Sequence, residues 1–169
     1  MSKPLMIATF SRHSSASCKT TLFIQPTMVQ ITEVKGDLFD CPGSYSLAHC
    51  VSQDLHMSKG IAAIFKQKFG GLDELQAQGA TVGGVAVLSR ENRHIYYLVT
   101  KFKYNQKPNY ADLESSLHKM KDHMLKNDVK HLAMPKIGCG LDRLQWSKVE
   151  ELIQKVFGDM DIMISVYEL

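Results

Sequence analysis

The sequence has 169 residues, of which 44% are hydrophobic and 22% charged, and its formal net charge is +3. This composition is typical of a globular domain and excludes a disordered or collagen-like chain. No apolar run approaches the ~18–20 residues of a membrane-spanning helix, so we expect no membrane span. The four cysteines do not have the spacing of a zinc site, so we expect them to be reduced thiols and the protein to bind no metal.

The N-terminal extension, residues 1–28, carries the whole charge surplus. It contains three of the 20 basic residues, Lys3, Arg12 and Lys19, and none of the 17 acidic ones, which leaves residues 29–169 with 17 of each. The extension is serine-rich and acid-poor, as organelle transit peptides are, but its apolar run is short. We expect a disordered extension, with mitochondrial targeting as the alternative, followed by one domain over residues 29–169.

Strands and helices alternate along the domain. Period-two alternation, or β-branched and aromatic residues, predict strands over residues 29–34, 46–51, 84–89, 94–100, 131–134 and 161–167. Apolar residues at helical spacing predict helices over residues 60–69, over 109–125, and around Ser147 and Glu150, which have the spacing of a capping box. This order predicts a three-layer α/β fold in which helices flank a mixed, mostly parallel sheet.

Unusual side chains follow four of the predicted strands. Asp37 follows the first strand, Ser52 the second, Lys101 the strand at 94–100, and Gly-Cys-Gly-Leu-Asp, residues 138–142, the strand at 131–134. The carboxyl ends of parallel strands meet at one edge of a sheet, where open α/β sheets bind ligands. We therefore expect these four strand ends to face one crevice.

Lys101 and Asp142 are the candidate reactive groups. A loop lysine is usually solvated, whereas burial beside an apolar strand would free its amine to attack a carbonyl-like carbon. Asp142 is either an acid that precedes a helix or a carboxylate placed for proton transfer.

Two further patterns have structural alternatives. Gly138 and Gly140 form either a plain turn or a loop whose backbone amides approach a phosphate. His49 and Cys50 could suggest a catalytic dyad, but neighbours on a strand point to opposite faces, so we expect both to serve packing.

Four segments together resemble one family. ITEVKGDLF, SLAHCVSQDLHMSKGIAAIFKQKFGG, IYYLVTK and MPKIGCGLDRLQW, in this order and spacing, resemble the macrodomains, and among them the terminal ADP-ribose protein glycohydrolases, also described as O-acyl-ADP-ribose deacylases. The likeness covers residues 29–169. It implies a macrodomain fold and a hydrolase that removes single ADP-ribose groups from Glu and Asp of modified proteins and deacylates O-acyl-ADP-ribose, with no cofactor and no metal.

The resemblance also assigns roles to residues. It implies that Lys101 attacks the anomeric carbon of the distal ribose to form a covalent adduct, which Asp142 helps to form and resolve. It implies a substrate-binding set that runs from the adenine to the distal ribose: Asp37, Leu38, Ser52, Thr100, Lys136, Ile137, Gly138, Cys139, Gly140, Leu141 and Leu169. Where a Gly-Ala-Gly loop is common in close relatives, this chain has Ser58-Lys59-Gly60.

The implied partners are ADP-ribose and ADP-ribosylated proteins, with ADP-ribosylated nucleic acid and poly-ADP-ribose as further candidates, bound by a monomer. The implied setting is the DNA damage response in the nucleus, in nucleoplasm and nucleolus, with the cytoplasm as a second location. A non-catalytic ADP-ribose reader is the alternative function, and it predicts binding without turnover. A direct nucleic-acid binder would need a basic stripe with exposed aromatic residues, which a neutral domain does not predict.

Overall fold

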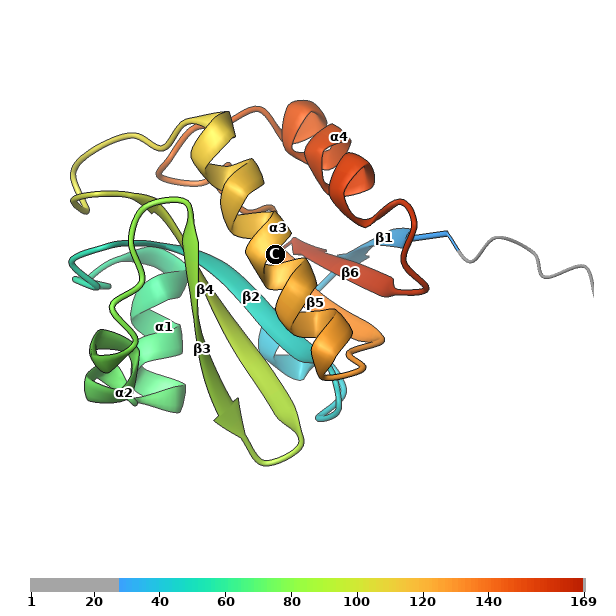
Figure 1. Ribbon diagram of the computed structural model, residues 1–169, viewed down its shortest axis with the longest axis horizontal. Coiled ribbons are helices and arrows are strands. Elements are labelled where there is room, and N and C mark those ends of the chain that lie inside the picture. Colours follow the sequence, from blue (N-terminus) through green and yellow to red (C-terminus); the bar gives the residue numbers. More distant parts are fainter. Residues whose placement is uncertain (1–27, 169) are drawn as a thin grey trace, which may run out of the picture.

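The computed structural model describes residues 28–168 (Figure 1). Its strands are β1 (Gln30–Lys35), β2 (Ser46–Ser52), β3 (Gly84–Arg90), β4 (Arg93–Lys101), β5 (His131–Pro135) and β6 (Met163–Glu168). They form one sheet in the order β1-β6-β5-β2-β4-β3, in which every neighbouring pair is parallel except the antiparallel hairpin of β3 and β4. The mixed, mostly parallel sheet is confirmed. The expectations for residues 1–27 and Leu169 lie outside the described residues.

Helices cover both faces of the sheet and make the predicted three layers. They are the short 3-10 helix η1 (Leu38–Asp40) and the α-helices α1 (Gly60–Phe69), α2 (Leu72–Ala77), α3 (Tyr110–Lys126) and α4 (Trp146–Phe157). α3 and α4 pack on one face, and η1, α1 and α2 on the other (Figure 1). Within residues 28–168, no helix has both the length and the apolarity to cross a membrane.

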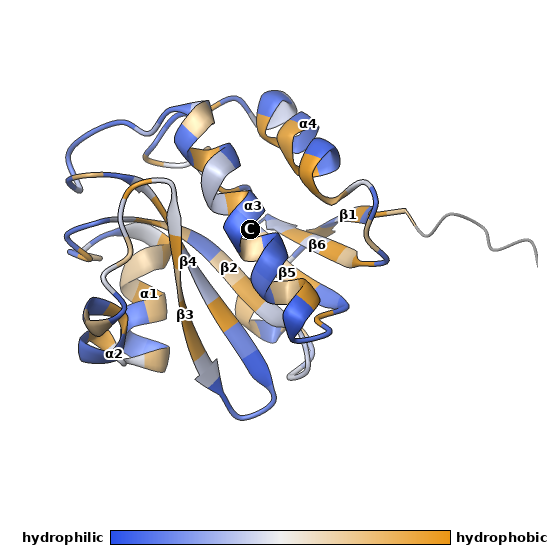
Figure 2. Ribbon diagram, in the orientation of Figure 1, coloured by the Kyte–Doolittle hydropathy of each residue, from blue (hydrophilic) through white to orange (hydrophobic). Residues whose placement is uncertain are grey.

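Side-chain alternation along the central strands supplies both cores. In β4, Tyr96 and Leu98 pack toward α3, whereas Ile95, Tyr97 and Val99 pack toward α1. Figure 2 shows the apolar residues concentrated along the strands and on the side of α4 that faces the sheet. A strand that is buried on both faces reads as a continuous apolar run, as β4 does.

His49 and Cys50 lie on opposite faces of β2, as predicted. The His49 ring stacks on Phe65 with centroids 3.9 Å apart, whereas Cys50 packs against the core under α3 and α4. Burial of the His49 imidazole lowers its pKa to about 3. His49 is therefore a neutral core residue at physiological pH, and the two side chains form no dyad.

The predicted capping box at the start of α4 is wrong. The N-cap is Gln145, whose side chain makes no capping hydrogen bond, and the helix already begins at Trp146. The Trp146 indole nitrogen donates to Oε1 of Glu33 on β1 at 3.0 Å. This tertiary contact holds the start of the helix, so Ser147 lies inside the helix and not at its cap.

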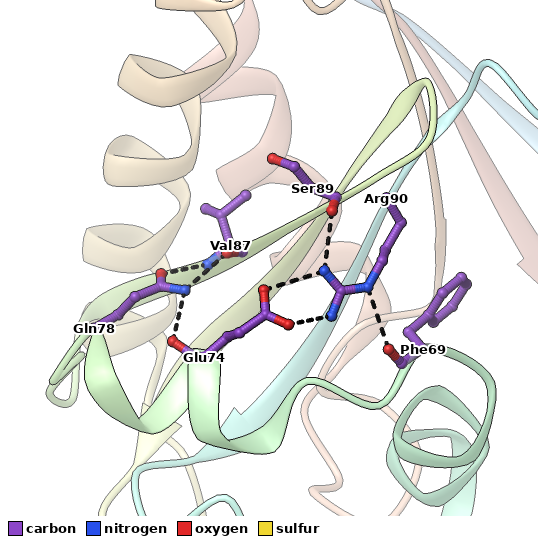
Figure 3. Close-up of polar contacts among 6 residues, drawn as sticks. All are labelled: Phe69, Glu74, Gln78, Val87, Ser89 and Arg90. Carbon is purple, nitrogen blue, oxygen red and sulfur yellow. Dashed lines mark hydrogen bonds and ion pairs between the residues drawn. The ribbon is translucent and has the colours of Figure 1, made fainter.

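Helix α2 was not predicted and is fixed by contacts with the edge strand β3. The Gln78 side-chain amide forms two hydrogen bonds with Val87: its oxygen accepts from the backbone N–H at 2.8 Å, and its nitrogen donates to the carbonyl at 2.8 Å (Figure 3). The Arg90 guanidinium donates to both carboxylate oxygens of Glu74 and to the carbonyl of Ser89 (Figure 3). These side chains therefore occupy backbone groups of the free edge of the sheet.

Candidate active site

A cavity of about 590 Å³ opens beyond the carboxyl ends of β2 and β4. Its wall consists of the end of β2, the start of α1, the loop that follows β4, and residues 140–143 after β5. Of the predicted site residues, those that line it are Ser52, Lys101, Gly140, Leu141 and Asp142. Three of the four strand ends thus meet as expected, while Asp37 at the end of β1 is not part of the lining.

Lys101 and Asp142 form an ion pair through Nζ and Oδ1 in the wall of the cavity. Their side chains are only 13% and 14% exposed. Lys101 is therefore not solvated, unlike an ordinary loop lysine. The two residues come from different elements, the end of β4 and the loop after β5. The fold therefore brings an amine and a carboxylate from two strand ends into direct contact, and the roles of nucleophile and proton acceptor that the resemblance implies for them stay predictions.

An irregularity in the pairing of β2 and β4 determines where Lys101 lies. Val51 pairs with Val99, but the next residue of β2, Ser52, pairs with Lys101, so Thr100 is the extra residue of β4. An extra residue bends a strand and changes the direction in which the following side chain points. Thr100 itself is only 1% exposed. The irregularity therefore brings Lys101 level with Ser52 at the cavity wall.

Cys50 brings a neutral thiol to the same wall. Burial, together with the nearby Asp142 carboxylate, raises the pKa of the thiol to about 12. A thiol with so high a pKa holds almost no thiolate at neutral pH, and the thiolate is the reactive form. At neutral pH the Cys50 side chain is therefore an unreactive thiol.

The residues that follow β5 do not all face the cavity. Lys136 pairs with Glu168 at 2.8 Å and with Glu33 at 3.4 Å, and these carboxylates raise the pKa of its amine. Ile137 is buried in the core, and the Cys139 thiol donates to the Ile137 carbonyl at 3.4 Å. Lys136 is thus held toward β1 and β6, and its implied contact with substrate stays a prediction.

Gly138 has a structural reason to be glycine. Its φ is +71°, and a Cβ at this position would lie 2.7 Å from Cδ1 of Leu144. Gly140 has open space around it and lines the cavity with Leu141, which is 74% exposed. The first glycine therefore serves the turn, and only the second borders the cavity.

The first residues of the implied substrate-binding set lie nearer to β1. Oδ1 of Asp37 accepts a hydrogen bond from the backbone N–H of Phe39 at 2.9 Å and thereby caps η1. Leu38 is buried in the core under α1 and α2. Ser52 lines the cavity and hydrogen-bonds to Asp54, whereas Leu169 lies outside the described residues. The implied role of Asp37 and Leu38 at the adenine stays a prediction.

Comparison with known proteins places the chain in a family. A family model described as Macro domain matches residues 48–153. The chain belongs to the macrodomain family. Over 144 residues it is 56% identical to a human protein named ADP-ribose glycohydrolase OARD1, and the aligned region is 85% of this chain and 95% of the human protein. The Bos taurus protein of the same name is 56% identical over 140 residues, 83% of this chain and 92% of the relative.

Solved structures confirm the macrodomain fold. The macrodomain of Thermus aquaticus DarG matches with a TM-score of 0.72 and 25% identity, over 83% of this chain and 99% of that one. Thermosipho africanus DarTG, solved in complex with ADP-ribose, matches with a TM-score of 0.70 and 24% identity, over 82% of this chain and 41% of that one. At 24% identity the second likeness concerns the fold alone.

This macrodomain has cavity residues that the sequence did not indicate as such. Tyr104 and Lys107, in the loop after β4, line the cavity, as does Arg143. The loop is anchored by a stack of Tyr104 on His56, with ring centroids 4.4 Å apart, and by a hydrogen bond from the Tyr104 backbone to Asp54 at 3.3 Å. Residues 102–108 have no apolar periodicity, so nothing in the pattern marked them as part of a site.

Proposed function

We propose that this macrodomain is a hydrolase that removes single ADP-ribose groups from Glu and Asp side chains of modified proteins and deacylates O-acyl-ADP-ribose. The relatives at 56% identity are named ADP-ribose glycohydrolase, which supports ADP-ribose hydrolase activity. The observation that carries the proposal is the contact between Lys101 and Asp142 in the cavity wall. A module that only binds its ligand needs no such pair.

The cavity suits a nucleotide of this kind. About 590 Å³ lies within the usual range for small-molecule sites. The first residues of α1, Gly60 and Ile61, line it, and unpaired backbone N–H groups at a helix start favour phosphate groups. A diphosphate at this position would leave the distal ribose to reach Lys101.

The reaction would proceed in two steps. Asp142 accepts a proton from the Lys101 ammonium, and the freed amine attacks the anomeric carbon of the distal ribose. A carbon–nitrogen bond forms as the bond from that carbon to the modified carboxylate breaks. The carboxylate leaves with the electron pair and takes the proton from Asp142, which is then ionised again. Water then adds to the same carbon while Asp142 accepts its proton. The carbon–nitrogen bond breaks, which releases ADP-ribose and the neutral lysine amine, and Asp142 returns its proton to that amine.

Mass spectrometry of a single reaction tests the mechanism. Wild type, Lys101→Ala and the control Lys103→Ala would each be incubated with a glutamate-linked mono-ADP-ribosylated protein. We expect wild type and Lys103→Ala to release ADP-ribose and to show an adduct on Lys101 when the reaction is stopped by rapid denaturation. Lys101→Ala should lack both product and adduct. Undiminished turnover by Lys101→Ala would contradict the mechanism, and binding without any turnover by wild type would favour the reader function.

We further propose that the modified partner is a protein, with ADP-ribosylated nucleic acid and poly-ADP-ribose as additional substrates, and that the chain acts as a monomer. The proposed setting is the nucleus during the DNA damage response. A fluorescent fusion in irradiated cells tests this setting, because we expect nuclear accumulation at damaged sites. A purely cytoplasmic signal would contradict it.

A further inference from the structure

The cavity concentrates positive charge that the domain as a whole does not have. Four of the 17 basic residues after residue 28 line the cavity, Lys59, Lys101, Lys107 and Arg143, but only one of the 17 acidic residues does, Asp142. The cavity lining therefore carries +3, and the rest of the domain carries −3. Such a separation raises the local concentration of an anionic ligand at the cavity.

Three of these cations have no carboxylate partner in the structure of residues 28–168. Lys101 is committed to Asp142, whereas Lys59, Lys107 and Arg143 form none of the ion pairs found there. By contrast, other lysines of the domain are paired, for example Lys121 with Asp159 at 2.5 Å and Lys155 with Glu114 at 2.6 Å. The cavity cations are thus available to a bound anion.

Lys59 differs from the other two because its position costs stability. It is the N-cap of α1, its side chain makes no capping hydrogen bond, and the first turn of α1 has no acidic residue. N-caps favour Ser, Thr, Asp or Asn, and a cation at the positive end of a helix is repelled by the helix dipole. Lys66 and Lys68, in the last turn of the same helix, lie where cations are favoured. Residues that break local rules in this way are concentrated at functional sites.

We infer that Lys59 is a specificity-determining residue that pairs with the diphosphate of ADP-ribose, an inference that rests on the proposed function. A bound diphosphate would stand beside both the Lys59 ammonium and the first backbone N–H groups of α1. The anion would therefore remove the repulsion that Lys59 creates in the free protein. Lys59 therefore lowers the stability of the free protein and raises its affinity for ADP-ribose.

The test uses the opposite signs of these two effects. In Lys59→Ser, which supplies a favourable N-cap, we expect the melting temperature of the free protein to rise by roughly 2–5 °C. We expect its affinity for ADP-ribose, measured by calorimetry, to fall about 5- to 10-fold, and its affinity to depend less on salt between 50 and 300 mM NaCl, because one charge contact is lost. The affinity for adenosine, which has no phosphate, should not change.

Two control variants separate charge from fold. Lys59→Arg keeps the cation and should bind ADP-ribose as tightly as wild type, within about twofold, without the gain in melting temperature. Lys66→Ser, on the same helix outside the cavity, should leave the affinity unchanged. Equal affinity of wild type and Lys59→Ser for ADP-ribose would overturn the inference and leave the glycohydrolase proposal standing. An equal loss for adenosine would overturn the assignment to the diphosphate. If wild type binds no ADP-ribose, both proposals fail.

Discussion

The positions of Lys101 and Asp142 along the chain could be predicted from the sequence, but the contact between their side chains could not. Their places at strand ends could be predicted, because apolar runs mark where strands end. Their contact depends on the extra residue Thr100 in β4, which shifts the pairing with β2 by one position. No residue type in the segment HIYYLVTK predicts that shift in pairing. The direction of the Lys101 side chain therefore needed either the structure or the family resemblance.

Replacement of Asp142 tests its part in the reaction. Asp142→Asn keeps the size of the side chain but accepts no proton, so we expect kcat for ADP-ribose release to fall by about 10²- to 10⁴-fold. Rapid-quench kinetics would measure this loss. Glu151→Asn, on the exposed face of α4, is the control and should retain full activity. An Asp142→Asn enzyme within threefold of wild type would rule out Asp142 as the proton acceptor.

His49 makes stability depend on pH. Its pKa is lowered from 6.5 to about 3 by burial, so folding requires the neutral ring. This contribution is complete above pH 6.5 and declines as the pH falls from 6.5 toward 3, by roughly 1.4 kcal/mol per pH unit, because the unfolded chain binds the proton first. We expect His49→Leu to be less sensitive to acid in urea unfolding from pH 7 to 4.5. His118→Leu, which changes an exposed histidine of α3, should keep the wild-type slope. Identical slopes for wild type and His49→Leu would contradict the assignment.

At the scale of elements, helices were predicted correctly where the apolar periodicity and the residues at the helix ends agreed. α1 has the predicted bounds, Gly60–Phe69, because an apolar stripe ends at a glycine pair. The helix predicted from residue 109 is α3, and Asn109 is its N-cap, with a side chain that accepts from the backbone N–H of Asp112 at 2.8 Å. α2 was missed because six residues hold too little periodicity, and its position depends on Gln78 and Arg90 binding a distant strand.

Gln78 protects the free edge of β3, and its removal should have two effects. Gln78→Ala loses the hydrogen bonds to Val87 and to Glu74, so we expect the free energy of unfolding to fall by about 1–2 kcal/mol. It also exposes backbone groups of an edge strand, which can pair with a second copy. Chemical unfolding and light scattering at rising concentration measure the two effects. Gln76→Ala, in the same helix, should show neither, and a Gln78→Ala protein as stable as wild type would contradict this role.

At the scale of the whole molecule, two cores hold one sheet between them, and the cavity opens beyond its strand ends. The class of fold could be predicted because alternating strand and helix patterns allow few arrangements. The cavity wall could be predicted only in part. Strand ends contributed Ser52 and Lys101, whereas Tyr104, Lys107 and Arg143 come from loops whose path depends on tertiary contacts.

A chain that begins at Met28 tests the independence of the domain. Without residues 1–27 the formal net charge falls from +3 to zero, while every contact described above is retained. We expect the melting temperature and the ADP-ribose hydrolase activity to match those of the full chain within error. A domain that fails to fold after this truncation would show that the extension contributes to the core.

The separation of charge between the cavity and the remaining residues gives the domain of residues 29–169, whose formal net charge is zero, a permanent electric dipole. Its +3 pole is at the cavity and its −3 pole is spread over the remaining surface. In the field of an approaching anion the domain therefore experiences a torque as well as an attraction, and its cavity turns toward the ligand before contact. Because ions in solution shield this field over about 8 Å at physiological strength, the orienting effect acts in the last molecular diameter of the approach.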